Sequence, residues 1–226
     1  MARFATPQKT WQVIVLVLAV AATVVVRMNR GTPTAPNANP RGPESSHSTA
    51  HTDPSGSVPP DSGKWEHLEG WTLVEDRSND GESFLLQRGG LTVLFRLYFA
   101  DCPEKYRNER NADRVADQAR YFGGISDDAT VATGEEARDF TLALLRKSTL
   151  TVDTRWENVY EPGRRYAFVT AGGKDLTELL VSRGLARIHT KGAAHPGGPS
   201  ERDEQSRLHQ MEREAKAARR GAWGRK

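Results

Sequence analysis

The stretch LTVLFRLYFADCPE, residues 91–104, decides how this chain is expected to fold and where its chemistry lies. Apolar and β-branched residues alternate through its first part, which predicts a strand over 91–99. One charged residue, Arg96, lies inside that strand, and two carboxylates, Asp101 and Glu104, follow its end. Folding alone requires only a turn at this point. The combination of an arginine with two carboxylates is the one that a cation and a phosphate would need.

Further strands and helices are predicted from hydrophobic spacing and turn residues on both sides of this stretch. The predicted strands are 71–77, 83–88, 91–99, 149–156, 166–170 and a short one at 185–188. The predicted helices are 111–122, 134–147, 175–183 and a last one opened by Ser200 and Asp203 and closed by Gly221. Thr133 and Glu136 form a capping box for the second helix. Five main strands with helices between and after them predict an α+β fold built on a small barrel.

The hairpin formed by 83–88 and 91–99 brings polar residues to one end. Its Gly-Gly turn sets the register, so that Ser83 is expected to face Arg96. The residues that then gather at this end are Glu82, Arg96, Asp101 and Glu104. Three carboxylates repel one another unless a cation lies among them, and hard divalent cations prefer carboxylate and carbonyl oxygens. A neighbouring arginine can bind a phosphate with its planar fork. The alternative is a strand end held by salt bridges, with a proline in the turn.

These residues resemble the signature of the staphylococcal-nuclease-like (thermonuclease) family. The matching segments are Asp80-Gly81-Glu82-Ser83, Phe95-Arg96-Leu97, Asp101-Cys102-Pro103-Glu104, Pro162-Gly163-Arg164, Glu178 through Arg187, and Gly221-Ala222-Trp223. They keep the family's order over residues 70–224. The resemblance implies an OB-fold, a five-stranded barrel with three to four packed helices. It also implies a Ca²⁺-dependent nuclease that cleaves DNA and RNA.

The resemblance assigns roles to individual residues. The catalytic residues are Arg96, Glu104 and Arg164, and the metal ligands are Glu82, Asp101 and the backbone carbonyl of Cys102. Two departures stand out. The family has an aspartate where this chain has Glu82, and the extra methylene moves the carboxylate by roughly 1.5 Å, against metal–oxygen distances of about 2.3–2.6 Å. The family's nucleotide-stacking tyrosines would fall near Thr190 and Gly192, and neither residue can stack.

Two functions remain open at this point. In the first, the resemblance implies that Ca²⁺ draws charge from phosphorus, that Arg96 and Arg164 stabilise the transition state, and that Glu104 orients or deprotonates water. The bond to the 5′ oxygen then breaks and leaves a 3′-phosphate. In the second, the domain is a weakened nuclease-like OB-fold that binds nucleic acid or protein. Glu82 and the missing tyrosines favour the second function, whereas retention of the three catalytic residues favours the first.

The N-terminal part predicts a membrane attachment. Residues 11–26 are almost entirely apolar and have basic residues on both sides, so residues 1–30 are expected to be an uncleaved signal anchor. A cleaved signal peptide, which would give a secreted protein, is the alternative. Residues 31–63 hold seven of the twelve prolines and no large aliphatic or aromatic residue except Val58, which predicts a disordered linker. The nuclease-like domain, 64–226, is then expected outside the cytoplasm, in the periplasm or the extracellular space.

Other features of the sequence point to no second site. Cys102 is the only cysteine, which excludes an intrachain disulfide and a cysteine-based zinc cluster. The Gly172-Gly173-Lys174 segment lacks the upstream glycine and the hydroxyl residue of a phosphate loop. His189 and His195 are most simply solvated residues of one loop. The formal charge is +3, and the last eleven residues carry five basic side chains and no acid. A monomer is expected.

Overall fold

A computed structural model describes residues 56–160 and 163–226. The predicted anchor over 1–30 lies outside the described residues, as does the linker up to residue 55. Within the part of the chain that is described, no helix is both long and apolar enough to cross a membrane. The predicted membrane attachment through residues 11–26 therefore stays a prediction.

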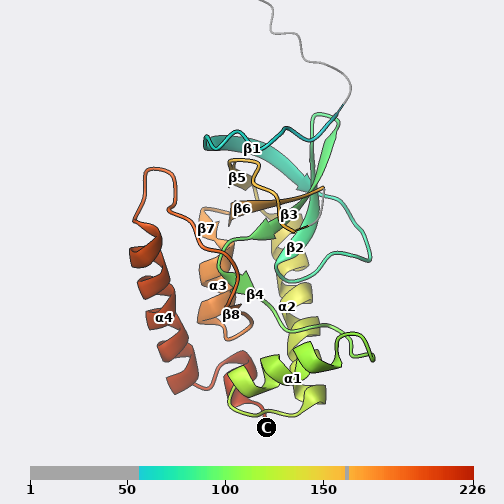
Figure 1. The fold of residues 1–226 in the computed structure, drawn as a ribbon, viewed down its shortest axis with the longest axis vertical. Coiled ribbons are helices and arrows are strands. Elements are labelled where there is room, and N and C mark those ends of the chain that lie inside the picture. Colours follow the sequence, from blue (N-terminus) through green and yellow to red (C-terminus); the bar gives the residue numbers. More distant parts are fainter. Residues whose placement is uncertain (1–55, 161–162) are drawn as a thin grey trace, which may run out of the picture. The chain divides into compact units, whose positions relative to one another are not determined.

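Five strands close into a barrel (Figure 1). They are β1 (Glu66–Leu73), β2 (Ser83–Arg88), β3 (Leu91–Leu97), β5 (Leu150–Thr154) and β6 (Arg164–Ala171). The first three form an antiparallel meander that contains the predicted hairpin, and β5 pairs with both β1 and β6. A parallel pairing between β3 and β6 closes the ring. The predicted five-stranded barrel is confirmed, and its mixed pairing is that of an OB-like fold.

The barrel interior is filled by the alternating apolar residues of the strands. Phe84, Leu86, Val93 and Phe95 are fully buried, as alternation on β2 and β3 predicts. Trp71 meets Phe95 edge-on, with ring centroids 5.1 Å apart. Large rings packed in this way bury much apolar area and stabilise the barrel.

Four helices accompany the barrel in the described part of the chain. They are α1 (Ala112–Tyr121), α2 (Asp127–Lys147), α3 (Leu176–Ser182) and α4 (Glu201–Ala217), followed by a 3₁₀ turn at Gly221–Gly224. The helices α2 and α3 pack against the barrel, whereas α1 packs against α2 and α4 packs against α3. Side-chain caps begin three of them, because Ser126, Asp175 and Ser200 each accept a hydrogen bond from a backbone N–H three residues later. In Figure 1, α1 lies beside the C-terminal 3₁₀ turn, and α2 extends from this region to the barrel.

The predicted start of the second long helix is wrong. The α2 helix begins at Asp127, seven residues before the predicted start, and Ser126 is its cap. Thr133 lies inside the helix, where its hydroxyl donates to the carbonyl of Ala129 at 2.8 Å. The capping box of Thr133 and Glu136 therefore does not exist. Two aspartates in the first turn, which interact favourably with the helix dipole, mark the true start.

Two of the predicted strands also differ clearly in their boundaries. The first runs over Glu66–Leu73 instead of 71–77, and a bulge between Glu69 and Trp71 interrupts the alternation that would reveal its first half. The strand predicted over 91–99 ends at Leu97, since Phe99 has φ of 62° and breaks it. The chain then continues as β4 (Ala100–Asp101), which pairs with β8 (Arg187–Ile188). The break redirects the chain so that Asp101 and the residues after it leave the barrel wall. The remaining short strand, β7 (Lys174–Asp175), extends the sheet beside β6.

Candidate active site

The hairpin of β2 and β3 places Arg96 among carboxylates, in the predicted register. Ser83 lies opposite Arg96, and the N–H of Leu97 donates to the carbonyl of Glu82 at 2.9 Å. Arg96 Nη1 donates to Glu82 Oε1 at 2.9 Å, and its Nη2 donates to Asp101 Oδ1 at 2.9 Å. The Arg96 side chain is 11 % exposed. Its guanidinium is therefore held in one orientation by two buried carboxylates.

Asp101 is the centre of the polar cluster. Its Oδ1 accepts from Arg96 and from Arg114, the latter at 2.7 Å. Its Oδ2 accepts from Arg187 Nε at 2.7 Å and from Gln118 at 3.4 Å. Burial raises the pKa of Asp101, but the guanidinium groups of Arg114 and Arg187 outweigh burial and leave the pKa below its ordinary value. Asp101 is therefore an ionised carboxylate with three cationic neighbours.

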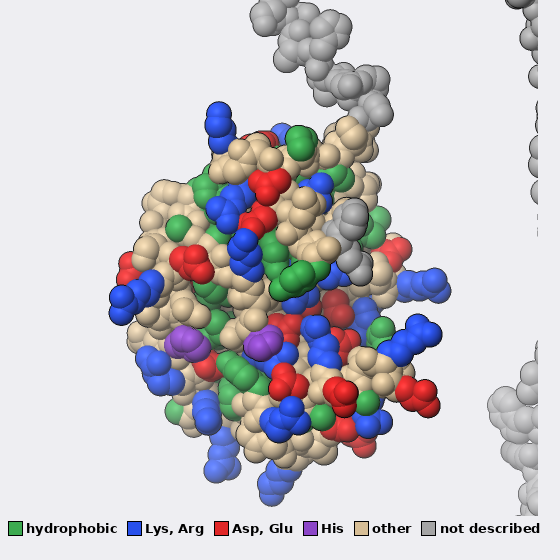
Figure 2. Space-filling view, viewed as in Figure 1, with side chains coloured by type: hydrophobic (Ala, Val, Ile, Leu, Met, Phe, Trp, Pro, Cys, Tyr) green, Lys and Arg blue, Asp and Glu red, His purple; other side chains and the backbone are tan. Residues whose placement is uncertain are grey.

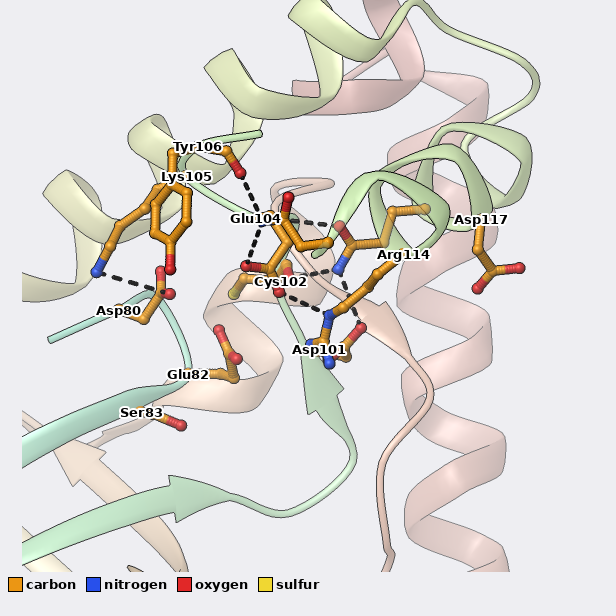
Figure 3. Close-up of polar contacts among 12 residues, drawn as sticks. Asp80, Glu82, Ser83, Asp101, Cys102, Glu104, Lys105, Tyr106, Arg114 and Asp117 are labelled. Atoms are coloured by element: carbon orange, nitrogen blue, oxygen red, sulfur yellow. Dashed lines mark hydrogen bonds and ion pairs between the residues drawn. The ribbon is translucent and has the colours of Figure 1, made fainter. Parts of the chain in front are cut away.

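One face of α1 lies against the end of β4 and the residues that follow it (Figure 3). Asn111, Arg114 and Gln118 follow the three- and four-residue spacing that places side chains on one side of a helix. Arg114 Nε contacts Glu104 Oε1 at 2.6 Å, and Asn111 donates to Glu104 Oε2 at 3.5 Å. Gln118 accepts from the N–H of Glu104 at 3.0 Å and donates to the carbonyl of Cys102 at 3.0 Å. The helix thus orients the predicted catalytic carboxylate.

The Asp80–Glu82 turn supplies the other side of the cluster (Figure 3). Lys105 Nζ lies 3.7 Å from Asp80 Oδ2 and donates to the carbonyl of Asn79 at 2.6 Å. Burial raises the pKa of Asp80 and raises that of Glu82 to about 7, although Arg96 opposes the rise at Glu82. Glu82 Oε2 is buried and has no hydrogen-bond partner within the described residues. This oxygen can therefore accept a further ligand.

The α2 helix packs against both the Asp80–Glu82 turn and the Pro103–Glu104 backbone. Thr141 donates to the carbonyl of Gly81 at 2.8 Å, which fixes the turn. A Cβ built on Gly134 would lie 2.4 Å from the carbonyl oxygen of Pro103 and 2.5 Å from that of Glu104. Only a glycine allows the helix to lie this close to the backbone that carries the predicted base. A glycine within a helix normally costs stability, so its presence at 134 reflects this contact.

Arg164 is the predicted site residue that the structure does not bring into the cluster. It begins β6 and lies beside Leu94 in the parallel pairing with β3. Its side chain is partly exposed, and in the described parts of the chain it makes no ion pair with Glu82, Asp101 or Glu104. Residues 161–162, which precede it, lie outside the described residues.

The thiol and the backbone carbonyl of Cys102 lie in different environments. The thiol is buried, and burial together with the Glu82 and Asp80 carboxylates raises its pKa well above the ordinary value. The thiol is therefore a packing group and a poor nucleophile. The carbonyl, predicted to be a metal ligand, accepts from Gln118 and retains a second lone pair.

The donor chemistry fits a hard divalent cation, but the arrangement is incomplete. Among the described residues, no group of three or more His, Cys, Asp or Glu side chains is placed so as to hold a metal ion. The unpartnered Glu82 Oε2 is the observation in favour of a cation, because a carboxyl oxygen buried without a partner is costly. The oxygens of Asp101 are already bonded to guanidinium groups, so a cation would have to exchange with one of them.

The two positions where stacking tyrosines are missing have structural roles instead. The Thr190 hydroxyl lies 3.2 Å from the hydroxyl of Tyr166. A Cβ on Gly192 would lie 2.4 Å from the ring of Phe99, so a tyrosine cannot occupy this position. Two other aromatic side chains are exposed: Tyr106, two residues after Glu104, and Tyr160, four residues before Arg164. Figure 2 shows acidic and basic side chains crowded together over the region of β4 and α1.

Several residues of the cluster escape sequence reasoning. They are Asn111, Arg114, Gln118 and Arg187. The apolar residues of 111–122 predict the helix, whereas its polar residues at the same spacing look like an ordinary solvated face. The signal in the sequence is Gln118, which falls three residues after Val115 and next to Ala119 on the apolar side of the helix, because an amide that becomes buried there requires partners.

The chain matches a known protein family. The sequence model of the staphylococcal nuclease homologue family matches residues 94–225, more than half of the chain. The match includes Arg96, Asp101, Glu104 and Arg164 and begins after the Asp80–Glu82 turn. None of the curated proteins compared with the chain matches it.

Proposed function

Because the chain belongs to the family of staphylococcal nuclease homologues, we propose that it is a phosphodiesterase that hydrolyses DNA and RNA. The observation that carries the proposal is the convergence of Arg96 and Glu104 on Asp101. Arg96 reaches it from the barrel wall, and Glu104 is joined to it through Arg114. This family acts on nucleic acids, and two of the three expected catalytic residues lie in one polar cluster.

Each catalytic residue has a role that its surroundings support. Arg96 is buried between two carboxylates, so its remaining N–H groups are preorganised for the charge that develops on phosphate oxygens. Glu104 is 19 % exposed and can hold or deprotonate the attacking water. Arg164 is proposed to bind the phosphate from the neighbouring strand. The water oxygen bonds to phosphorus, and the 5′ oxygen leaves and takes up a proton, so a 3′-phosphate remains.

A calcium ion is proposed as the cofactor, in keeping with the family's general dependence on it. Glu82 Oε2, the Asp101 carboxylate and the Cys102 carbonyl would hold it. When bound, Ca²⁺ draws charge from phosphorus through a phosphate oxygen. The chain's own contribution is to keep these oxygens beside the arginine that binds the phosphate.

The proposed setting is a membrane surface. Residues 11–26 are proposed to anchor the chain, residues 31–63 to act as a linker, and residues 64–226 to work outside the cytoplasm as a monomer. The grounds are the apolar N-terminal run and the proline-rich segment after it. Protease added to intact cells should release a domain of this size. A soluble full-length protein in the cytoplasm would contradict the anchor.

A binding module is the second candidate function, and one observation favours it. Asp101 is surrounded by guanidinium groups, and the described residues form no ready metal cluster. Under this alternative, the OB-like barrel binds nucleic acid or protein without cutting. Arg96 would then contribute charge alone, and Glu104 would contribute nothing.

Digestion of DNA and RNA by the full-length chain, with added Ca²⁺ or with chelator, separates the two functions. If the protein is a nuclease, Glu104→Gln and Arg96→Lys should each lower the rate at least ~10²-fold, since one base or one preorganised donor supplies about that much. Substrate binding should survive in Glu104→Gln. Arg110→Gln, on an exposed residue near α1, is the matched control and should cleave normally. Absence of Ca²⁺-dependent cleavage by the wild type would support the binding module.

A further inference from the structure

The guanidinium of Arg114 bridges two carboxylates that have different proposed roles. Its Nη2 lies 2.7 Å from Asp101 Oδ1, and its Nε lies 2.6 Å from Glu104 Oε1. Asp101 is a proposed cation ligand, whereas Glu104 is the proposed base. A single positive charge therefore lies between the oxygens that a divalent cation and its bound water would use.

Arg114 differs from the other two arginines around Asp101 in its freedom to leave. The side chains of Arg96 and Arg187 are 11 % and 5 % exposed, whereas that of Arg114 is 44 % exposed. Removing a buried guanidinium from its carboxylate would leave both charges without solvent, which is costly. Arg114 can instead turn its charge into water at the surface of the cluster. It is therefore the arginine that can exchange with an external cation.

Other contacts of α1 remain in place if the Arg114 side chain moves. Gln118 is fully buried and is hydrogen-bonded to the backbone on both sides of Pro103. The apolar side of the helix is anchored independently, since Val115 and Ala119 are buried. The exchange thus requires only a side-chain rotation and leaves the helix where it is.

We propose that Arg114 is a positioning residue that acts as an internal counter-cation. It holds Asp101 and Glu104 when no divalent cation is bound, and it releases them when one binds. This inference rests on the proposed calcium site. Its consequence is that the affinity of the site for Ca²⁺ is set by competition with a side chain of the chain itself.

Calorimetric titration of Ca²⁺ into the full-length chain tests the inference without measuring activity. Arg114→Gln removes the competing charge, so Ca²⁺ should bind about tenfold more tightly or better, because a charge this close changes a carboxylate's affinity for a cation by at least that much. Arg114→Lys keeps the charge and should bind like the wild type. Arg110→Gln removes an equal charge that lies outside the cluster and should change little.

The pattern of results separates this inference from the proposed function. Equal or weaker Ca²⁺ binding by Arg114→Gln, when the wild type binds, would overturn the inference and leave the calcium site standing. Absence of binding by both proteins would overturn both. Binding by the variant alone would support the competition most strongly. A purely structural role for Arg114 cannot tighten cation binding, and thermal melting of the variant checks that the fold is kept.

Discussion

Replacement of Gly134 by alanine tests whether the helix α2 positions Glu104, the proposed base. The change should stabilise an isolated helix by about 1 kcal/mol, because glycine is the poorer helix former. In the folded chain, the new Cβ would lie 2.4 Å from the carbonyl oxygen of Pro103, where ordinary contacts begin near 3.4 Å. The helix and the strand end must therefore separate by about 1 Å. Both neighbours are backbone, so no side-chain rotation can relieve the contact.

The expected result is a loss of both stability and rate. Overpacking of this kind costs about 1–3 kcal/mol, which offsets the gain in helix propensity and leaves a net loss of up to about 2 kcal/mol. A displacement of about 1 Å at a catalytic group can lower the rate about 10²-fold. Urea unfolding measures the first effect, and Ca²⁺-dependent digestion of single-stranded DNA measures the second.

A matched control lies one residue further along the same helix. Glu135→Ala also replaces a residue by alanine, but its side chain is exposed, and surface changes of this kind alter stability by less than about 0.5 kcal/mol. If Gly134→Ala proves more stable than the wild type and equally active, the close approach of α2 does not position Glu104. The stability result stands even if the protein is a binding module.

Three further predictions concern the site and its surroundings. Glu82→Asp should weaken Ca²⁺ binding about tenfold in a titration, because the shorter side chain loses its 2.9 Å bond to Arg96; tighter binding would show that glutamate strains the site. Asp175→Asn keeps the cap of α3 but removes a charge whose pKa burial raises from 3.8 to about 6. Because this pKa is higher in the folded than in the unfolded chain, its contribution to the stability of the wild type is complete below about pH 3.8 and is lost as the pH rises through 6. The free energy of unfolding of the variant relative to the wild type, measured in urea, should therefore rise by about 1–1.5 kcal/mol from pH 5 to pH 8. An advantage independent of pH would refute this. Tyr106→Ala should raise KM for single-stranded DNA about 5-fold or more with kcat unchanged, whereas Tyr106→Phe should not, since stacking needs only the ring.

The barrel could be predicted from the sequence because its strands have clear local sequence patterns. Alternation and Gly-Gly turns give β2 and β3 with their register, and the family resemblance supplies the closure. The errors in the strands arise where the backbone departs from the regular alternation. The bulge at Gly70 hides the first half of β1, and Phe99 adopts a positive φ that apolar alternation cannot reveal.

The candidate site could be predicted only in part. The resemblance identifies Arg96, Asp101 and Glu104, and the structure brings them together. Most of the residues that orient them come from α1, and Arg187 comes from β8; none of these residues is assigned a role by the resemblance. Arg114 looks in the sequence like any exposed arginine on a surface helix. Its role depends on the packing of α1 against the end of β4, which spacing within the helix does not encode.

The parallel pairing of β3 with β6 has a consequence for the order of folding. Leu94 and Arg164 become neighbours only when two segments far apart in the chain meet. Asp101 accepts a hydrogen bond from Arg187, which lies still later in the sequence. Contacts of such long sequence separation form late, because loop closure must precede them. A chain that does not yet include residue 187 therefore lacks one of the three guanidinium groups that surround Asp101. Under the proposed nuclease function, a truncated chain that ends before residue 187 would therefore have all five barrel strands but an incomplete site.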